Sequence, residues 1–394
     1  MLGLTCLPDK VTKFLYPFKR HFRCAQARHH LLFSWVLVLL SLDSGKATLA
    51  RLSSLAPSRI RYWALRRLVA SGQWDACALI GDMAQVTLAL LPPPADRVLY
   101  LCGDKTLKGK RGQKHPLAHK TRMNEHSGYV FGFELVLLLA SWGRYRVPVR
   151  LGLVDPKRPG HPNLLFRQML RDFVPPPWAQ QVVVLADAGF AANVTFRLLG
   201  RKGYGYVFAV SRTRKLTTGQ HLSDCVRHLP KSRYRRLASY KPDGRRTDYW
   251  VYSRLAALNH LGDVTLIFSK QRRNDGPKKT KILVTNLTQA RASETLSRYS
   301  RRWGVELTFK ELKGGLHLGQ MQVTADPERV SRSVALSVLA YLLLVGLYAR
   351  DQTPEKPFSL FQLKERCLRE AFQDQLSRSH KRWEEKFRRR KPAA

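Results

Sequence analysis

Four residues with chemically useful side chains recur at helical spacing near position 300. Arg302, Glu306 and Lys313 follow Tyr299 at offsets of 3, 7 and 14 residues. On one continuous helix, at about 100° per residue, the four side chains fall within an arc of roughly 60°. A carboxylate flanked by cations could act on a phosphate ester while the cations hold its phosphates, arginine in a bidentate fork. The alternative is a solvated stripe of salt bridges, which is common on helices.

Two further carboxylates follow apolar segments. Asp104 comes after Arg97–Cys102, and Asp187 comes directly after Gln181–Ala186. Each is predicted at the C-terminal end of a buried strand, where α/β sheets place ligands. An aspartate there can equally be an ordinary strand terminator or helix cap.

Together with Glu306, these two aspartates predict a site of three carboxylates. Converging carboxylates repel one another unless cations lie between them, and carboxylate oxygen is a ligand that Mg²⁺ prefers. Two divalent ions about 4 Å apart can activate a water or a 3′-hydroxyl at a phosphodiester.

The charge balance points to a polyanionic partner. The chain has 394 residues with 69 Lys and Arg against 28 Asp and Glu, a formal net charge of +41. Such an excess favours nucleic acid as the partner. No G-x-x-x-x-G-K-[ST] phosphate loop is present, so we expect no use of ATP.

A membrane surface is the rival partner for so basic a chain. The longest apolar runs, Leu31–Leu42 and Leu336–Tyr348, have 12 and 13 residues, which is too short to span a bilayer. No signal peptide is evident. The six cysteines form no CxxC pair, which argues against a disulfide framework or a zinc site and fits a reducing compartment. We therefore expect a cytoplasmic protein with no membrane partner.

The order of apolar segments predicts an α/β fold. Three adjacent strands followed by strand–helix alternation indicate a mixed sheet flanked by helices. The predicted strands are Arg97–Cys102, Tyr129–Ala140, Arg146–Val154, Gln181–Ala186 and Tyr204–Val210, with helices at Leu164–Phe173 and Ala191–Leu199. A basic, strand-like segment follows, with strands at Asp248–Leu255, Asp263–Ser269 and Lys281–Asn286, and then helices at about Ala292–Lys313 and Val330–Tyr348.

The first 95 residues are predicted to be helical. Lys46–Leu55 and Ser58–Ala70 are two short helices separated by a turn at Ala56-Pro57. This layout suits a helix-turn-helix that reads a major groove, and a plain helical hairpin with a solvated basic face fits it equally. The outward residues of the second helix are Arg59, Tyr62 and Arg66.

Two other places are candidates for DNA contact. Lys105–Arg122 holds seven Lys or Arg and no acid, which predicts either a basic loop beside Asp104 or a solvated charge run. Trp250, on a strand of the basic segment, could stack on a base or belong to the core. Lys105, Lys108 and Trp250 are therefore candidate DNA-binding residues.

The spacing Tyr299-(2)-Arg302-(3)-Glu306-(6)-Lys313 resembles the Y-(2)-R-(3)-E-(6)-K signature of DDE transposases of the insertion-sequence-4 type. The flanking residues, Arg301-Arg302-Trp303 before the glutamate and Phe309-Lys310-Glu311-Leu312-Lys313 after it, fit as well. Asp104 resembles the first aspartate of that family. Asp187, within Ala186-Asp187-Ala188-Gly189-Phe190, resembles the second. The resemblance covers about residues 97–350.

The resemblance implies an RNase H-like core with a β-rich insertion between the fifth strand and the helix that carries the glutamate. Whether Lys281–Asn286 belongs to the insertion or to the core stays open. The predicted division is a helical DNA-binding region at 1–95, core at 96–210, a basic insertion at 211–287, core with the glutamate helix at 288–350, and a basic helical tail at 351–394.

The resemblance also implies residue roles. Asp104, Asp187 and Glu306 would bind two Mg²⁺ ions, for which Mn²⁺ would substitute. Tyr299, Arg302 and Lys313 would contact the phosphates of the DNA ends.

The implied activity is that of a DNA transposase. It would bind the terminal inverted repeats of an insertion sequence, cleave the ends by Mg²⁺-dependent hydrolysis and join the 3′-OH ends to target DNA by transesterification. It would work as a homodimer in a prokaryotic cytoplasm, associated with the nucleoid. The alternative is a catalytically inactive or repurposed transposase-derived DNA-binding protein, for which metal-dependent cleavage is the discriminating test.

Overall fold

A computed structural model describes most of the chain, in two compact units. The described residues are 9–22, 48, 50, 62–109, 115–122, 128–241, 244–320, 326–351 and 359–388. The helical unit comprises residues 1–92, 112–116 and 309–394, and the sheet unit comprises residues 93–111 and 117–308. The predicted division into five segments stays a prediction.

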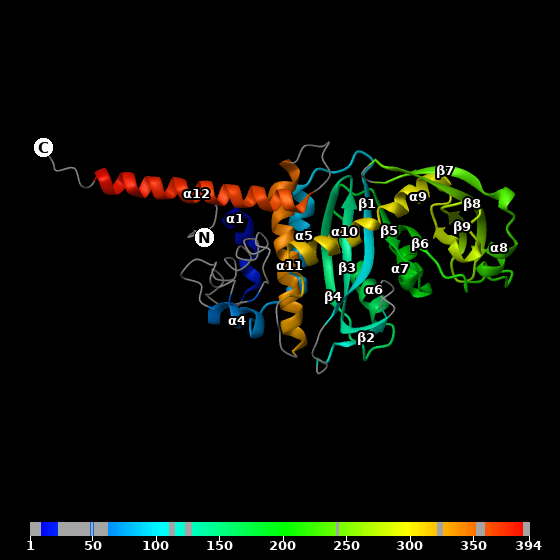
Figure 1. The fold of residues 1–394 in the computed structure, drawn as a ribbon, viewed down its shortest axis with the longest axis horizontal. Coiled ribbons are helices and arrows are strands. Elements are labelled where there is room, and N and C mark those ends of the chain that lie inside the picture. The colour runs from blue at the N-terminus through cyan, green and yellow to red at the C-terminus, as the bar shows by residue number, and fades with distance from the viewer. Residues whose placement is uncertain are drawn as a thin grey trace. The chain divides into compact units, whose positions relative to one another are not determined.

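All ten strands of the sheet unit form one mixed sheet, in the order β2-β3-β1-β5-β6-β10-β9-β8-β7, with β4 paired to β3 (Figure 1). Strands β1, β5 and β6 are parallel and the other pairs are antiparallel. The strands are β1 Val98–Gly109, β2 His119–Arg122, β3 Tyr129–Trp142, β4 Tyr145–Leu153, β5 Gln181–Ala186, β6 Gly205–Ala209, β7 Arg235–Tyr240, β8 Arg246–Leu258, β9 Gly262–Lys270 and β10 Lys281–Thr285. This arrangement confirms the predicted α/β class and its mixed sheet flanked by helices.

The central parallel strands bring the two aspartates to one edge of the sheet. After its exposed first residue, Gln181, strand β5 is apolar and buried through Ala186, as expected for a parallel strand covered by helices. In its register with β1, Gly103 lies opposite Ala186, so Asp104 and Asp187 follow at adjacent positions. A side chain at Gly103 would meet the ring of Phe166 on helix α6 (His161–Asp172) at 2.1 Å, so glycine lets this helix pack closely beside Asp104.

The structure corrects the prediction around Asp104. Strand β1 does not end before Asp104 but continues to Gly109, and Asp104 pairs with Leu137 of the long strand β3. The predicted basic loop Lys105–Arg122 is therefore wrong in its first and last residues. Its first residues belong to β1 and its last four belong to β2, because both strands pair with β3.

The predicted helix Ala292–Lys313 is in fact two helices, α9 (Ala292–Ser300) and α10 (Trp303–Gly315). At the break, the amides of Arg302, Gly304 and Val305 each donate to the carbonyl three residues earlier. These tighter bonds interrupt the i→i−4 ladder. The expected single helix through Tyr299, Arg302, Glu306 and Lys313 is therefore wrong.

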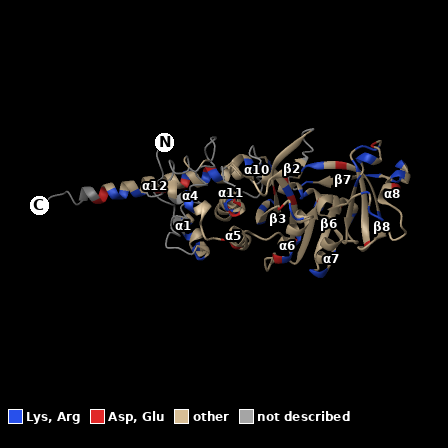
Figure 2. Cartoon of the chain, turned by 90° about the horizontal axis from the view of Figure 1, so that it is seen from below, with Lys and Arg blue, Asp and Glu red and all other residues tan. Residues whose placement is uncertain are grey.

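Strand β10 lies between the predicted core and the predicted insertion. It pairs with β6 on one side and with β9 on the other, so one sheet runs through both segments. The insertion also contains a helix that the sequence did not predict, α8 (Leu222–His228). Figure 2 shows Lys and Arg on β7, α8 and β8.

The remaining helices of the sheet unit are α6 and α7 (Asn193–Arg201). Helix α6 packs on β3, α7 packs on β6, and α9 contacts both β6 and β7. The predicted helices Leu164–Phe173 and Ala191–Leu199 thus form within one to three residues of the expected bounds.

The helical unit is built around α11, which contacts α1, α4, α5 and α12 (Figure 1). Its helices are α1 Asp9–Leu15, α4 Tyr62–Ala70, α5 Ala76–Leu90, α11 Pro327–Tyr348 and α12 Leu360–Arg388, and it also holds the later part of α10. The predicted helix Lys46–Leu55 and Arg59 lie outside the described residues, apart from residues 48 and 50. The predicted helix-turn-helix stays a prediction.

Helix α11 is longer than the apolar run Leu336–Tyr348. Over Pro327–Asp351 it is the one helix of the described residues that is long and apolar enough to cross a membrane. Of its most apolar window, 89% is buried inside the protein, as in the core helix of a folded domain. Burial, rather than length, is therefore what favours a core helix here.

Candidate active site

A guanidinium group links two of the three predicted carboxylates. Arg302 Nη1 donates to Asp104 Oδ2 at 2.6 Å, and Arg302 Nη2 donates to Glu306 Oε1. The side chains of Arg302 and Asp104 are only 15% and 14% exposed. These ion pairs are therefore mostly withdrawn from solvent, unlike a solvated surface stripe.

Asp187 completes the group from the neighbouring strand. It follows β5 and caps the short 3₁₀ helix η2 (Ala188–Phe190), its carboxylate accepting the Gly189 amide at 2.9 Å. A carboxylate that accepts a backbone N–H in this way is held in a defined orientation.

Burial is the main reason that the pKa of Asp104 is raised. Arg302 and the Lys105 amide lower this pKa, Asp187 and Glu306 add smaller upward contributions, and the net shift is upward. Arg302 is the main group that opposes the effect of burial on Asp104.

Two more residues face this group. Burial raises the pKa of Tyr299 to about 12, with Arg302 opposing and Asp187 and Asp104 adding to the shift. The ammonium group of Lys281 lies 5.3 Å from the centre of the Tyr299 ring. Desolvation and Arg302 lower the pKa of Lys281, whereas Glu306 and Asp187 raise it, and the net shift is downward.

Sequence reasoning missed Lys281. Its only signal was its place as the first residue of a short strand just before the helix that carries the glutamate. The antiparallel pairing of β10 with β6 brings Lys281 to the edge at which β6 ends, and this pairing is not visible in the sequence.

The three carboxylates are a donor set that suits a hard divalent cation. In this structure Arg302 is bonded to two of them, Asp104 and Glu306. Three carboxylates with mutually repelling charges are what oxygen-liganded metals bind. Among the residues that the structure describes, no three His, Cys, Asp or Glu side chains are arranged as a ready metal site. Arg302 occupies Asp104 Oδ2 and Glu306 Oε1, so the guanidinium competes with a metal ion for these two oxygens.

The other predicted DNA contacts are spread over the molecule. Lys105 Nζ bonds Glu134 Oε1 at 3.0 Å, and Lys108 is half-buried in β1. Trp250 is half-buried on β8 beneath the guanidinium of Arg273, which lies 5.3 Å from its ring centre. Their roles in DNA binding stay predictions.

Two further candidates lie in the helical unit. Arg66 is exposed on α4 and stacks over Trp63 at 5.1 Å. Lys313 lies in the last turn of α10, in the part that belongs to the helical unit. Their roles in DNA binding also stay predictions.

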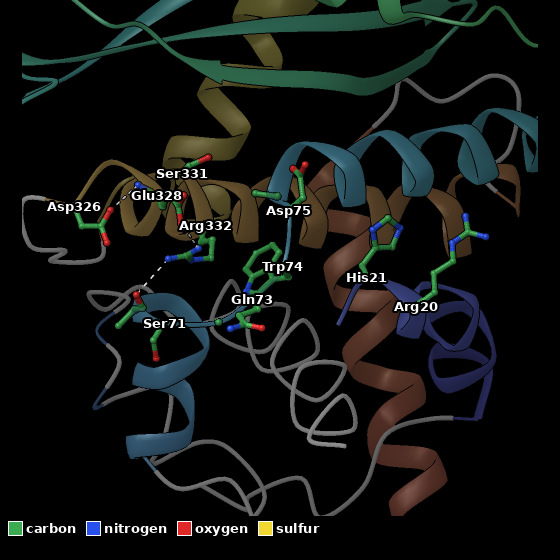
Figure 3. Close-up of a pocket in the computed structure, with 13 residues that line it drawn as sticks. Arg20, His21, Ser71, Gln73, Trp74, Asp75, Asp326, Glu328, Ser331 and Arg332 are labelled. Atoms are coloured by element: carbon green, nitrogen blue, oxygen red, sulfur yellow. Dashed lines mark hydrogen bonds and ion pairs between the residues drawn. The ribbon is translucent and has the colours of Figure 1, made fainter. Parts of the chain in front are cut away.

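The helical unit has a hollow of about 800 Å³ whose acidic residues serve the local fold (Figure 3). Asp75 caps α5 by accepting the amides of Cys77 and Ala78, and Asp326 caps α11 by accepting that of Glu328.

An arginine on the wall of this hollow also has a structural role. Arg332 bonds Glu328 at 3.0 Å and donates to the carbonyls of Val69 and Ala70 at the end of α4. These contacts satisfy carbonyls that have no partner within the helix. Helix termini therefore account for Asp75, Asp326 and Arg332 in this hollow.

The raised pKa of Asp104 predicts a gain in stability when its charge is removed. The folded protein disfavours the ionised form, so wild-type stability falls as pH rises from the unfolded value of 3.8 through the raised pKa. In Asp104→Asn this cost is absent, while Arg302 keeps Glu306 as a partner.

We expect Asp104→Asn to melt at the same or a higher temperature than wild type at pH 7 in EDTA. The difference should shrink as pH falls. Thermal unfolding followed at several pH values checks this, and a lower melting temperature at pH 7 would contradict the sign of the shift.

Comparison with known proteins identifies the family. The family model described as "Transposase DDE domain" matches residues 120–343, more than half of the chain, including Asp187, Lys281, Arg302 and Glu306. No curated protein matches the sequence.

A cryo-EM structure of a piggyBac transposase synaptic complex with hairpin DNA is similar in fold. Its TM-score is 0.50 at 12% sequence identity, and the match covers 99% of this chain and 81% of that chain. At such an identity the likeness concerns the fold alone. The family match, by contrast, spans the strands and helices that carry two of the three carboxylates, and on this ground the chain belongs to the transposase DDE domain family.

Proposed function

We propose that the protein is an active DNA transposase that cleaves phosphodiester bonds at the ends of a mobile element and joins the freed 3′-OH ends to target DNA. The observation that carries this is the meeting of Asp104, Arg302 and Glu306 at one edge of the sheet, with Asp187 on the neighbouring strand. Membership of the transposase family and the formal charge of +41 support a DNA substrate.

The chain's own residues suggest how a scissile phosphate is held. Arg302 and Lys281 present cations beside the carboxylates, and arginine can grip a phosphate through two parallel N–H bonds. When a phosphate takes over Arg302, the carboxylates lose their compensating charge. Substrate binding and metal binding are thereby coupled at Arg302.

We further propose that Asp104, Asp187 and Glu306 hold divalent metal ions, with Mg²⁺ as the physiological ion and Mn²⁺ as a substitute. When bound, the ions would supply charge stabilisation and a more acidic water or hydroxyl at the phosphodiester. Hydrolysis adds water across the P–O bond and frees a 3′-OH. In joining, that hydroxyl forms a new P–O bond to target DNA as a target P–O bond breaks and its 3′ oxygen leaves.

The finer assignments rest on the sequence signature. We propose an insertion-sequence-4-type enzyme that binds terminal inverted repeats, works as a homodimer on paired DNA ends, requires no ATP and resides in a prokaryotic cytoplasm. The signature spacing of Tyr299, Arg302, Glu306 and Lys313 supports the type, although helix α10 contains only its last two residues.

A DNA-binding protein without catalysis is the alternative. It keeps the basic surface but does not need Asp104, Asp187 and Glu306 together. The presence of all three acids in the chain favours the enzyme.

The test is nicking of duplex DNA that carries the gene's flanking sequences. We expect purified protein to release 3′-OH ends with Mg²⁺ or Mn²⁺, and none in EDTA. Tight DNA binding with no nick under any divalent ion would favour the alternative.

A further inference from the structure

A basic hollow lies in the predicted insertion, outside the carboxylate site. It has a volume of about 610 Å³ and lies where the 3₁₀ turn η4 (Pro277–Lys279) packs against α8. Its lining holds four cations and one carboxylate: Arg212, Arg227, Lys278, Lys279 and Asp275. Ser223, Asn274 and the backbone at Gly276 add neutral polar groups.

The single acid in the hollow is engaged by its own turn. The Arg272 amide donates to Asp275 Oδ2 at 3.0 Å, and Lys279 Nζ lies 3.9 Å from Asp275 Oδ1. Asp275 thus fixes the turn that carries Lys278 and Lys279. Outside the lining, Asp224 lies 3.6 Å from Arg227 Nη1. Counted with Asp224, the hollow still has four cations against two carboxylates, an excess of positive charge that an anion can neutralise.

The rim of the hollow is held rigidly by Arg212. Its guanidinium donates to the carbonyls of Lys278 and Thr280, the latter at 3.0 Å, and so ties the segment after β6 to the segment before β10. A site built on a fixed rim costs less side-chain ordering on binding than one made of free lysines.

The sheet places this hollow beside the carboxylate site. Strand β10 begins at Lys281, whose ammonium group lies 5.3 Å from the centre of the Tyr299 ring, and the guanidinium of Arg302 lies 5.9 Å from the same ring. Lys279 of the hollow precedes Lys281 by two residues. Two residues of extended chain span about 7 Å. The hollow therefore lies within reach of a DNA backbone that is bound at Lys281.

We propose that this hollow binds a backbone phosphate of the same DNA duplex whose scissile phosphate lies at the carboxylate site. The inference rests on the proposed function and adds to it a second, non-catalytic anchor. That anchor would fix the direction in which the duplex leaves the active site.

The test compares two double variants of equal charge change. Arg227→Ala with Lys278→Ala removes two exposed cations of the hollow. The control, Arg197→Ala with Arg201→Ala, removes two exposed cations of α7. Helix α7 ends just before the first residue of β6, whereas Arg212 of the hollow follows the last residue of β6, so the control lies at the other end of that strand.

Binding of a labelled duplex of about 40 base pairs is measured across a salt series. The slope of log K against log salt is negative, and we expect it to be shallower by about one in the hollow variant, which corresponds to the loss of one phosphate contact. The control slope should stay at the wild-type value. Equal slopes for hollow variant and wild type, or an equal loss in the control, would overturn the proposal.

The same experiment separates this inference from the proposed function. If wild type binds and nicks DNA while the hollow variant keeps the full slope, only the second anchor is wrong. If wild type binds DNA but never nicks it with any divalent ion, the proposed enzyme is wrong, and a reduced slope would then show only that the hollow contacts DNA.

A free phosphate ion is the other ligand that could occupy the hollow, because it has the same anionic oxygens as the DNA backbone. Calorimetric titration with inorganic phosphate at constant ionic strength distinguishes it from DNA. Heat of binding to wild type that the hollow variant lacks, together with unchanged DNA slopes, would assign the hollow to a soluble anion and overturn the DNA anchor.

Discussion

Replacing Glu306 by Gln should abolish Mg²⁺-dependent nicking while DNA binding is kept or slightly strengthened. The amide has nearly the shape of the carboxylate but lacks the charge that a metal ligand needs, and the lost charge no longer repels phosphate. Loss of about 4 kcal/mol of charge stabilisation corresponds to about a thousandfold in rate. The measurement is the single-turnover nicking rate with saturating protein.

A matched control comes from the neighbouring helix. Glu294 on α9 pairs with Arg298 and is 48% exposed, so Glu294→Gln makes the same chemical change at a surface ion pair. Its nicking rate should equal that of wild type. Full nicking by Glu306→Gln, or an equal loss in both variants, would remove Glu306 from the reaction.

The central strands were predictable because their signal is local. Gln181–Ala186 is a continuous apolar segment, and the structure has β5 over the same residues. A strand buried on both faces needs no alternation, so its bounds are readable without knowledge of its neighbours. The position of Asp187 at its end followed directly.

Asp104 shows where local reasoning stops. Its strand was expected to end with the apolar residues, but pairing with β3 carries β1 through polar residues to Gly109. Strand length was here decided by a partner about 30 residues away. Asp104 was nevertheless placed beside Asp187, because the parallel register and not the strand end sets their neighbourhood.

The break between α9 and α10 and the role of Lys281 were beyond the sequence for a related reason. Helical periodicity predicted one face for Tyr299 and Glu306, whereas tighter turns at Arg302 redirect the chain. The approach of Lys281 depends on which strand β10 joins. Both features depend on tertiary structure. Together they decide which cations, Arg302 and Lys281, lie near the carboxylates.

Removing the guanidinium of Arg302 should affect both stability and DNA binding. In Arg302→Ala, Asp104 and Glu306 lose their shared cation while Asp104 remains mostly buried. Breaking such a pair on one side typically costs about 3–5 kcal/mol when fully buried, and less here because Glu306 is 32% exposed. We expect a lower melting temperature in EDTA, and a salt slope of DNA binding reduced by about one.

A double-mutant cycle tests the cause of the instability. If the loss comes from uncompensated carboxylates, adding Asp104→Asn to Arg302→Ala should restore much of the melting temperature, because the buried charge is gone. If the loss came from packing alone, the second substitution would add its own effect and restore nothing.

Arg302→Lys distinguishes charge from geometry. Lysine keeps the cation and should recover most of the stability, yet its single ammonium cannot bond Asp104 and Glu306 through two nitrogens or grip a phosphate in a bidentate fork. We therefore expect near-normal melting with a nicking rate that stays well below wild type. Full recovery of nicking by Arg302→Lys would show that Arg302 acts only as a positive charge, and the coupling proposed between phosphate capture and release of the carboxylates would be wrong.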